Sequence, residues 1–197
     1  MQNRNNLKFQ LLIFIIFWTT LSSAQNDNPF RFFKEEKEFT YGLNNRRTFI
    51  LDDFTTIYGI YAGVAYGEKV KHVLTLNSTL FYIGNKPPNM VKLNFIGFSE
   101  EFYFFRRNKW AFCTYAHGGV GQLNNSSPQI ALENRKEWVY PTEWGLHTEY
   151  SLWPWLNLRT GIGYRYVLNK PSLNIDGVYL KLGATLNPKK IIKNHTE

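Results

Sequence analysis

Three residue types that serine hydrolases combine occur at alternate positions in the second half of the sequence, as His147, Glu149 and Ser151. A hydroxyl nucleophile, an imidazole base and a carboxylate that orients the base make up the catalytic triad of such enzymes. A spacing of two puts all three side chains on one face if the segment is a β-strand. Hydrolysis is therefore the first chemistry to consider, and it depends on what this face meets.

Metal binding by His117 and His147 is a second possible chemistry. Zinc sites use three or four protein ligands, and the sequence offers no third ligand at a fixed spacing from the two histidines. Its glycines make no phosphate-binding loop, because none of them opens a helix. We therefore predict no catalytic residue, no metal and no cofactor.

The segment that must position these side chains runs from Trp138 to Leu168. Its residues alternate between apolar and polar, and the alternation breaks at Trp153 and Pro154. A period of two indicates two strands, and a proline, which cannot donate a backbone hydrogen bond, suits the turn between them. The segment is therefore predicted to be a β-hairpin with one apolar and one charged face.

The apolar face of this hairpin carries aromatic residues near its ends and aliphatic residues between them. Transmembrane β-barrels show this pattern, because aromatic side chains lie where the lipid-facing band meets the two interfaces. A soluble sandwich also alternates, so periodicity alone leaves a soluble secreted β-barrel or sandwich open. The order of strands and connections helps to choose between them.

Eight segments alternate as strands do: 36–43, 55–67, 70–83, 91–105, 110–122, the two arms of 138–168, and 175–187. The connections are in turn longer (44–54, 84–90, 123–136 and 169–174) and tight (67–69, 106–109 and 153–154). Barrels of the bacterial outer membrane have even strand numbers, short periplasmic turns and longer extracellular loops. We therefore predict an all-β fold, an eight-stranded antiparallel transmembrane β-barrel of this kind.

In such a barrel the charged face points inward, where a buried charge is costly unless it is paired. The acids of the first hairpin strand are placed to pair with the arginines of the second. We predict a polar network in the barrel interior, formed by His117, Glu143, His147, Glu149, Arg159 and Arg165, and Lys181 is also expected to face inward. Because a triad that acts on membrane lipid must face lipid, the same placement argues against catalysis.

One pair of residues does not fit the alternation. Glu100 and Glu101 are adjacent, so a regular strand must point one of the two carboxylates outward. A β-bulge would shift the parity and resolve the conflict. The sequence does not say where such a bulge would lie.

Residues 1–24 are predicted to be a signal peptide, with basic residues, a short apolar run and small residues before Gln25. The run is too short for a transmembrane helix, which needs about 20 residues. Residues 25–35 would be a leader, 36–187 the barrel and 188–197 a basic C-terminal tail. Cys113 is the only cysteine, so an internal disulfide is excluded.

Three stretches carry a resemblance to a known group: YGIYAGVAYG with its tight GEK turn, NLRTGIGYRY, and YLKLGATLNP. Over residues 36–187 the chain resembles the small eight-stranded outer-membrane β-barrels of the OmpA/OmpX type, and the generic outer-membrane β-barrel family common in Bacteroidetes. The resemblance lies in pattern, and the chain departs from many bacterial barrels because it does not end in an aromatic residue.

The resemblance implies a non-catalytic protein of the outer membrane with a structural or partner-binding role in the cell envelope. The expected partners are outer-membrane lipid, lipopolysaccharide and, as a further option, an envelope protein, and we expect a monomer. The net charge of +8 suits anionic lipid head groups better than nucleic acid, because the chain is exported and has no nucleic-acid motif. A lipid-modifying enzyme similar to lipid A deacylases is the alternative.

Overall fold

The computed structural model describes residues 35–50, 53–79, 91–125, 135–171 and 174–187. All of these residues except Glu35 belong to one compact unit, Glu36–Glu197. The predicted signal peptide, nearly all of the leader and the basic tail after residue 187 lie outside the described residues, as do residues 80–83 of the third predicted strand. The described residues include no helix that is long and apolar enough to cross a membrane.

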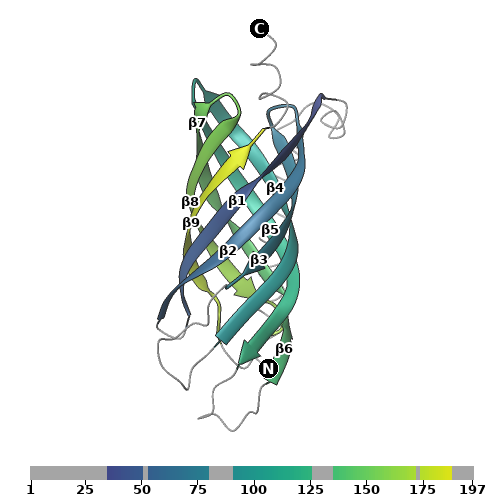
Figure 1. Ribbon diagram of the computed structural model, residues 1–197, viewed down its shortest axis with the longest axis vertical. Helices are drawn as coiled ribbons and strands as arrows, with labels where there is room; N and C mark the ends of the chain where they lie inside the picture. The colour runs from purple at the N-terminus through teal and green to yellow at the C-terminus, as the bar shows by residue number, and fades with distance from the viewer. Residues whose placement is uncertain (1–34, 51–52, 80–90, 126–134, 172–173, 188–197) are drawn as a thin grey trace, which may run out of the picture. The chain divides into compact units, whose positions relative to one another are not determined.

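The strands form a single antiparallel sheet that closes on itself (Figure 1). Its order is β4-β3-β2-β1-β9-β8-β7-β5-β6, and the pairing of β4 with β5 closes the ring. The strands are β1 (Lys37–Ile50), β2 (Asp53–Tyr66), β3 (Val70–Ser78), β4 (Val91–Arg107), β5 (Trp110–Asn125), β6 (Arg135–Val139), β7 (Pro141–Trp153), β8 (Leu156–Val167) and β9 (Gly177–Leu186).

The segments β6 and β7 together make one barrel strand. Both pair with β5 in a continuous register, and only Tyr140 separates them. The nine segments therefore form an eight-stranded barrel, which confirms the predicted fold. Closure gives every barrel strand a hydrogen-bonded neighbour on both sides over part of its length, which satisfies the backbone groups along these ladders.

The tight turns, the start of β1 and the end of β9 all lie at one end of the barrel, which we call the turn end. The turns are Gly67–Lys69, Asn108–Lys109 and Pro154–Trp155. A backbone hydrogen bond joins the Gly67 amide to the Glu36 carbonyl, and another joins the Asn187 amide to the Trp155 carbonyl. The opposite end, where β1, β5 and β8 finish, is called the loop end.

Alternate residues of each strand face opposite sides of the barrel wall. On β9, for example, Tyr179 and Lys181 are almost fully buried, whereas Val178 and Leu180 are more than half exposed. This follows from the period of two in a pleated strand. The outward surface is consequently rich in leucine, isoleucine, phenylalanine, tyrosine and tryptophan, and the charged residues of the hairpin point inward.

The first strand is longer than the sequence indicates. Residues 44–54 were predicted to be a loop because they mix charges with apolar residues, but β1 continues to Ile50 and pairs there with Asp53 of β2. The prediction was wrong because a barrel interior accepts polar side chains that a soluble core rejects. Asn44, Arg46 and Thr48 all point inward and are buried.

Strand β4 contains a β-bulge, as predicted, but the bulge does not turn both glutamates inward. The register shifts between Tyr103 and Phe105, so the extra residue is Phe104, beyond the two acids. The strand is regular at Glu100 and Glu101. Glu101 is buried inside the barrel, and Glu100 points outward.

The long loop predicted at 123–136 is also shorter than expected. Strand β5 continues to Asn125, and β6 begins at Arg135. Leu123 and Val139 face inward here and are fully buried. The polar composition of this stretch again made strand residues look like a loop, because the outward residues Gln122, Asn124 and Lys136 are hydrophilic.

Deleting Phe104 should be tolerated. Without the extra residue Tyr103 still faces inward and Phe105 outward, so we expect the free energy of unfolding to change by no more than about 1 kcal/mol. Deleting Phe98 instead forces one side of β4 to reverse its parity. That variant should lose at least about 3 kcal/mol, because buried charges leave their partners.

Urea unfolding in detergent, followed by tryptophan fluorescence, measures both deletions. Equal losses of stability in the two variants would show that Phe104 is not a removable extra residue.

Candidate functional site

The barrel interior is filled by two clusters of ion pairs and one group of apolar side chains. We call the first the Glu143 cluster (Glu143, Arg46, Arg165, Tyr115 and Tyr179). The second is the Glu101–Glu149 cluster (Glu101, Glu149, Arg159, Lys71, Lys181, Tyr103 and His147). Alternation along the strands sends all of these side chains inward, and all are at most 4% exposed.

Glu143 on β7 is held by two arginines from different sides. Its Oε2 lies 2.7 Å from Arg46 Nε, and its Oε1 lies 2.8 Å from both Arg165 Nη2 and Arg165 Nε. Tyr179 also donates a hydrogen bond of 3.4 Å to Oε2, and Tyr115 and Tyr179 are joined through their hydroxyls at 2.6 Å. Both carboxylate oxygens are therefore used, which offsets the cost of burying this charge.

Arg46 extends this cluster to two more polar residues. Its Nη1 donates to Asn44 Oδ1 at 3.1 Å and to Asn77 Oδ1 at 2.5 Å. One guanidinium thus connects β1 to β3 and β7, which are not neighbours in the sheet. The planar fork of five donors makes arginine suited to such a junction.

Arg159 on β8 is the centre of the Glu101–Glu149 cluster. Its Nη2 lies 2.5 Å from Glu101 Oε2, and its Nε lies 2.8 Å from Glu149 Oε1. Lys71 Nζ approaches the same two acids, at 3.3 Å from Glu149 and 3.8 Å from Glu101. The Tyr103 hydroxyl, which has one proton to donate, lies 2.6 Å from Glu149 Oε1 and 3.2 Å from Glu101 Oε2. Two acids thus share two cations and one hydroxyl.

Cations outnumber acids among these buried side chains. Three glutamates face five cations, namely Arg46, Lys71, Arg159, Arg165 and Lys181. Aromatic faces stabilise part of the excess positive charge. Lys181 Nζ lies 3.9 Å from the centre of the Tyr115 ring, and the guanidinium carbon of Arg159 lies 5.3 Å from that of Tyr61.

His147, Glu149 and Ser151 do not form a triad. Four residues along one strand span roughly 13 Å, so sharing a face does not bring Ser151 to His147. Arg159 Nη2 lies 2.7 Å from His147 Nε2, and since a guanidinium only donates, this nitrogen accepts and its lone pair is occupied. His147 and Glu149 are also buried inside the barrel, away from the outward surface.

Side chains of the types that bind metal ions do come together at one point in the barrel interior. Glu101, Cys113 and His147 bring ligand atoms within 4.8 Å of one another, because Cys113 lies opposite His147 in the register. Arg159 contacts both Glu101 and His147, and Lys71 and Lys181 lie within 4 Å of Glu101. Three positive charges make this place unfavourable for a metal ion. His117 is not part of the group.

His117 lies across from Glu143 in the register of β5 and β7. It is buried and packs edge to face against Phe95, with ring centres 5.8 Å apart. Neither ring nitrogen has a hydrogen-bond partner among the described residues. Within that part of the chain it is therefore a packed side chain rather than a member of the ion-pair clusters.

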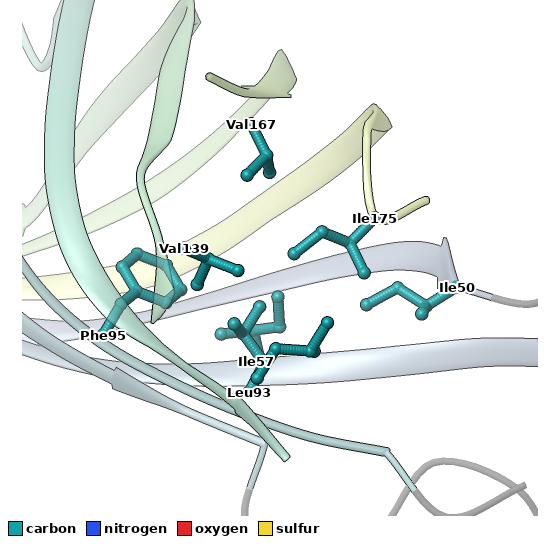
Figure 2. Close-up of a cluster of buried hydrophobic side chains, with 8 residues drawn as sticks. Ile50, Ile57, Leu93, Phe95, Val139, Val167 and Ile175 are labelled. Atoms are coloured by element: carbon teal, nitrogen blue, oxygen red, sulfur yellow. The ribbon is translucent and has the colours of Figure 1, made fainter. Parts of the chain in front are cut away.

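An apolar cluster fills the barrel at the loop end (Figure 2). Its members come from six strands and the segment before β9 and are buried almost completely: Ile50, Ile57, Leu93, Phe95, Leu123, Val139, Val167 and Ile175. Figure 2 shows these side chains converging on one another. We call this group the apolar plug.

Sequence reasoning missed three charged members of the interior. Arg46 was hidden in a stretch read as a loop, and Glu101 could not be told from Glu100. Lys71 has the same parity as Thr75 and Asn77, so extending the alternation of β3 by two positions would have identified it. The apolar plug could not be recognised in the sequence, because inward-facing aliphatic residues at the strand ends interrupt the alternation of an apolar outer and a polar inner face.

The chain is similar to solved barrel structures. Neisserial surface protein A matches with a TM-score of 0.54 and 14% identity, over 77% of this chain and 96% of that one. The N-terminal β-barrel domain of OprF from Pseudomonas aeruginosa matches with 0.58 and 12%, over 77% and 99%. Ail, the attachment invasion locus protein of Yersinia pestis, matches with 0.51 and 8%, over 77% and 96%.

The chain has the fold of an eight-stranded outer-membrane β-barrel. No protein-family model and no curated protein matches its sequence. At these identities the likeness concerns the fold, and the role of the barrel has to be argued from its own residues.

Replacing Arg46 by leucine should destabilise the barrel by about 3 kcal/mol, because Glu143 loses one of its two buried cations. Replacing the neighbouring Arg47 by leucine is the matched control. Arg47 faces outward and is exposed, so its loss should leave stability unchanged or raise it.

Urea titration in detergent gives both free energies of unfolding. Equal destabilisation by Arg46→Leu and Arg47→Leu would contradict the assignment of residues 44–50 to a strand with Arg46 inside.

Proposed function

We propose that the protein is a non-catalytic barrel of the outer membrane with a structural or partner-binding role in the cell envelope. The observation that carries this proposal is the filled interior. The ion-pair clusters occupy the middle of the barrel, and the apolar plug occupies the loop end. A barrel whose interior is filled in this way is a rigid support rather than a channel.

The packing argues against a pore. Eight strands enclose only enough space for side chains, and here bulky tyrosine and arginine side chains take that space. At Gly163 an added Cβ would lie 2.5 Å from the Tyr115 hydroxyl, so even a methyl group has no room beside it. Ions would have to pass both this layer and the dry apolar plug.

The outward surface supports residence in a membrane. Leucine and isoleucine side chains that are about half exposed, such as Leu180 and Ile162, have no other way to leave water in a single-layered barrel. The same feature disfavours the soluble binding module. The predicted signal peptide supplies the route of export to the outer membrane.

The outer wall at the loop end supports contact with anionic lipid, such as lipopolysaccharide. Lys92 and Lys136 flank Asn124 in the register of β4, β5 and β6. All three face outward, since Leu93 and Leu123 face inward. With Trp138 one step below Lys136, the basic side chains would lie at the level of lipid phosphates.

A lipid-modifying activity receives no comparable support. Of the triad residue types singled out in the sequence, His147 and Glu149 face inward, and Ser151 lies four residues from His147 along the same strand. His147 also accepts a hydrogen bond from Arg159. The loops and the periplasmic end remain the surfaces through which a partner-binding role would operate.

Purified protein in planar lipid bilayers should show no stable conductance steps, because ion pairs and the apolar plug fill the lumen. A general porin reconstituted in parallel is the positive control. Reproducible single-channel steps from folded protein would overturn the proposal of a non-conducting barrel.

Cell fractionation should recover the mature chain, cleaved after residue 24, in the outer membrane. The folded barrel should also migrate differently on a gel before and after boiling, since its closed sheet resists detergent. Recovery in the soluble fraction, with no shift on boiling, would argue for the soluble alternative.

A further inference from the structure

Positive charge is concentrated at one of the three tight turns. The turn between β4 and β5 has the sequence RRNK over residues 106–109, and all four residues are exposed. The turn between β2 and β3 carries one acid and one base, Glu68 and Lys69, and the turn Pro154–Trp155 carries no charge. The β4–β5 turn is therefore a local source of positive charge on one side of the barrel.

Two of these cations lie beside outward aromatic rings. Arg107 is opposite Trp110 in the register and two residues after Phe105, and both aromatic residues are exposed. Lys109 Nζ lies 6.0 Å from the centre of the Tyr150 ring, which is itself 4.7 Å from that of Trp110. Among the described residues no acid pairs with Arg107 or Lys109, so both charges are available to an external anion.

The outer wall beside this turn contains an open hollow of about 340 Å³. It is lined by Phe105, Arg107, Asn108, Trp110 and Phe112. Phe105 and Phe112 face each other across the two strands, with ring centres 5.6 Å apart. We call this the turn-end hollow. One part of it is apolar, and the part at the turn is polar and cationic.

Two features of β4 explain why the hollow is there. The β-bulge puts two consecutive phenylalanines, Phe104 and Phe105, on the outer surface, where they are 56% and 45% exposed. Pairing with β3 ends where the Tyr103 amide donates to the Lys69 carbonyl, so residues 104–107 pair with β5 and not with β3. The side chains of this part of β4 are consequently left uncovered on one side.

The two parts of the hollow match the two parts of a phospholipid. Tryptophan side chains collect where the hydrocarbon of a membrane meets its head groups, so Trp110 marks this level at the turn end. Phe105 and Phe112 then lie level with acyl chains, and Arg107 lies level with the phosphates. Basic pockets beside apolar surfaces at this level bind lipid head groups.

We propose that the turn-end hollow binds one anionic phospholipid of the periplasmic leaflet, with its phosphate on Arg107 and its acyl chains on Phe105 and Phe112. A guanidinium donates two parallel hydrogen bonds to a phosphate, and the Asn108 amide is a further donor. Lys109 adds a second positive charge. The inference rests on the proposed membrane location and names the class of lipid that the turn end binds.

Charge complementarity selects the occupant. Phosphatidylethanolamine carries an ammonium group, which Arg107 and Lys109 would repel, whereas phosphatidylglycerol carries a phosphate and an uncharged glycerol. An acidic polymer of the periplasm would also meet the two cations, but it has no apolar part to cover Phe105 and Phe112. An anionic lipid satisfies both parts of the hollow.

Photo-crosslinking in lipid bilayers tests the proposal. Phe112 is replaced by p-benzoyl-phenylalanine, and the barrel is reconstituted with equal amounts of phosphatidylglycerol and phosphatidylethanolamine that have the same acyl chains. Mass spectrometry of the cross-linked protein identifies the bound lipid by its head group. Phosphatidylglycerol adducts should exceed phosphatidylethanolamine adducts by about fivefold or more, because each cation near the surface favours an anionic lipid by about that factor.

Charge variants locate the effect. Arg107→Gln should lower this ratio by about threefold or more, because one of the two cations is lost. Lys37→Gln is the matched control: it also removes one exposed positive charge from the turn end, but on β1, where Glu36 and Glu38 flank it, and the ratio should not change. The same probe in place of Phe39, which is 73% exposed on β1, should cross-link both lipids equally.

A folded, membrane-inserted barrel that cross-links both lipids equally at position 112 overturns the inference and leaves the proposed function intact. A preference that survives Arg107→Gln, or that is as strong at position 39, also overturns it, because the attraction would then come from the overall charge of the barrel. Absence of a lipid preference together with Arg107-dependent sedimentation on isolated cell-wall polymer would assign the hollow to that polymer instead. Failure of the chain to enter membranes would reject the proposed function itself.

Discussion

Burial of charge inside a closed wall is the constraint on which the rest of this structure depends. Glu143 on β7 is neutralised by Arg165 from the next strand and by Arg46 from across the lumen. The first contact exists in any hairpin of this sequence, but the second exists only when the barrel is closed. Since an acid or an arginine left alone in this interior would be strongly unfavourable, the charged layer favours closure and opposes any register that would turn it outward.

The layers of the interior explain why the barrel is suited to a passive role. Charged side chains in the middle bind one another, and the apolar plug at the loop end excludes water from them. Hydrogen bonds from Tyr103 and Tyr179 satisfy acceptor capacity that ion pairs leave open. Within the described residues, His147 Nε2 is thus engaged by Arg159, and Cys113 is buried inside the wall.

The two faces of β4 show how one strand serves two purposes. Glu101 takes part in the interior network, while Glu100, one residue earlier, faces outward beside His72. The bulge at Phe104 comes too late to hide both acids.

The sequence by itself determined the number of strands, their alternation and the facing of the acids of the first hairpin strand toward the arginines of the second, because a period of two assigns faces within a strand. It could not reveal Arg46, whose polar surroundings look like a loop until an interior exists to receive them. Nor could it decide between Glu100 and Glu101, or show that Lys71 meets Glu149. Those contacts join strands far apart in the chain, and only the closing of the sheet brings their inward faces together.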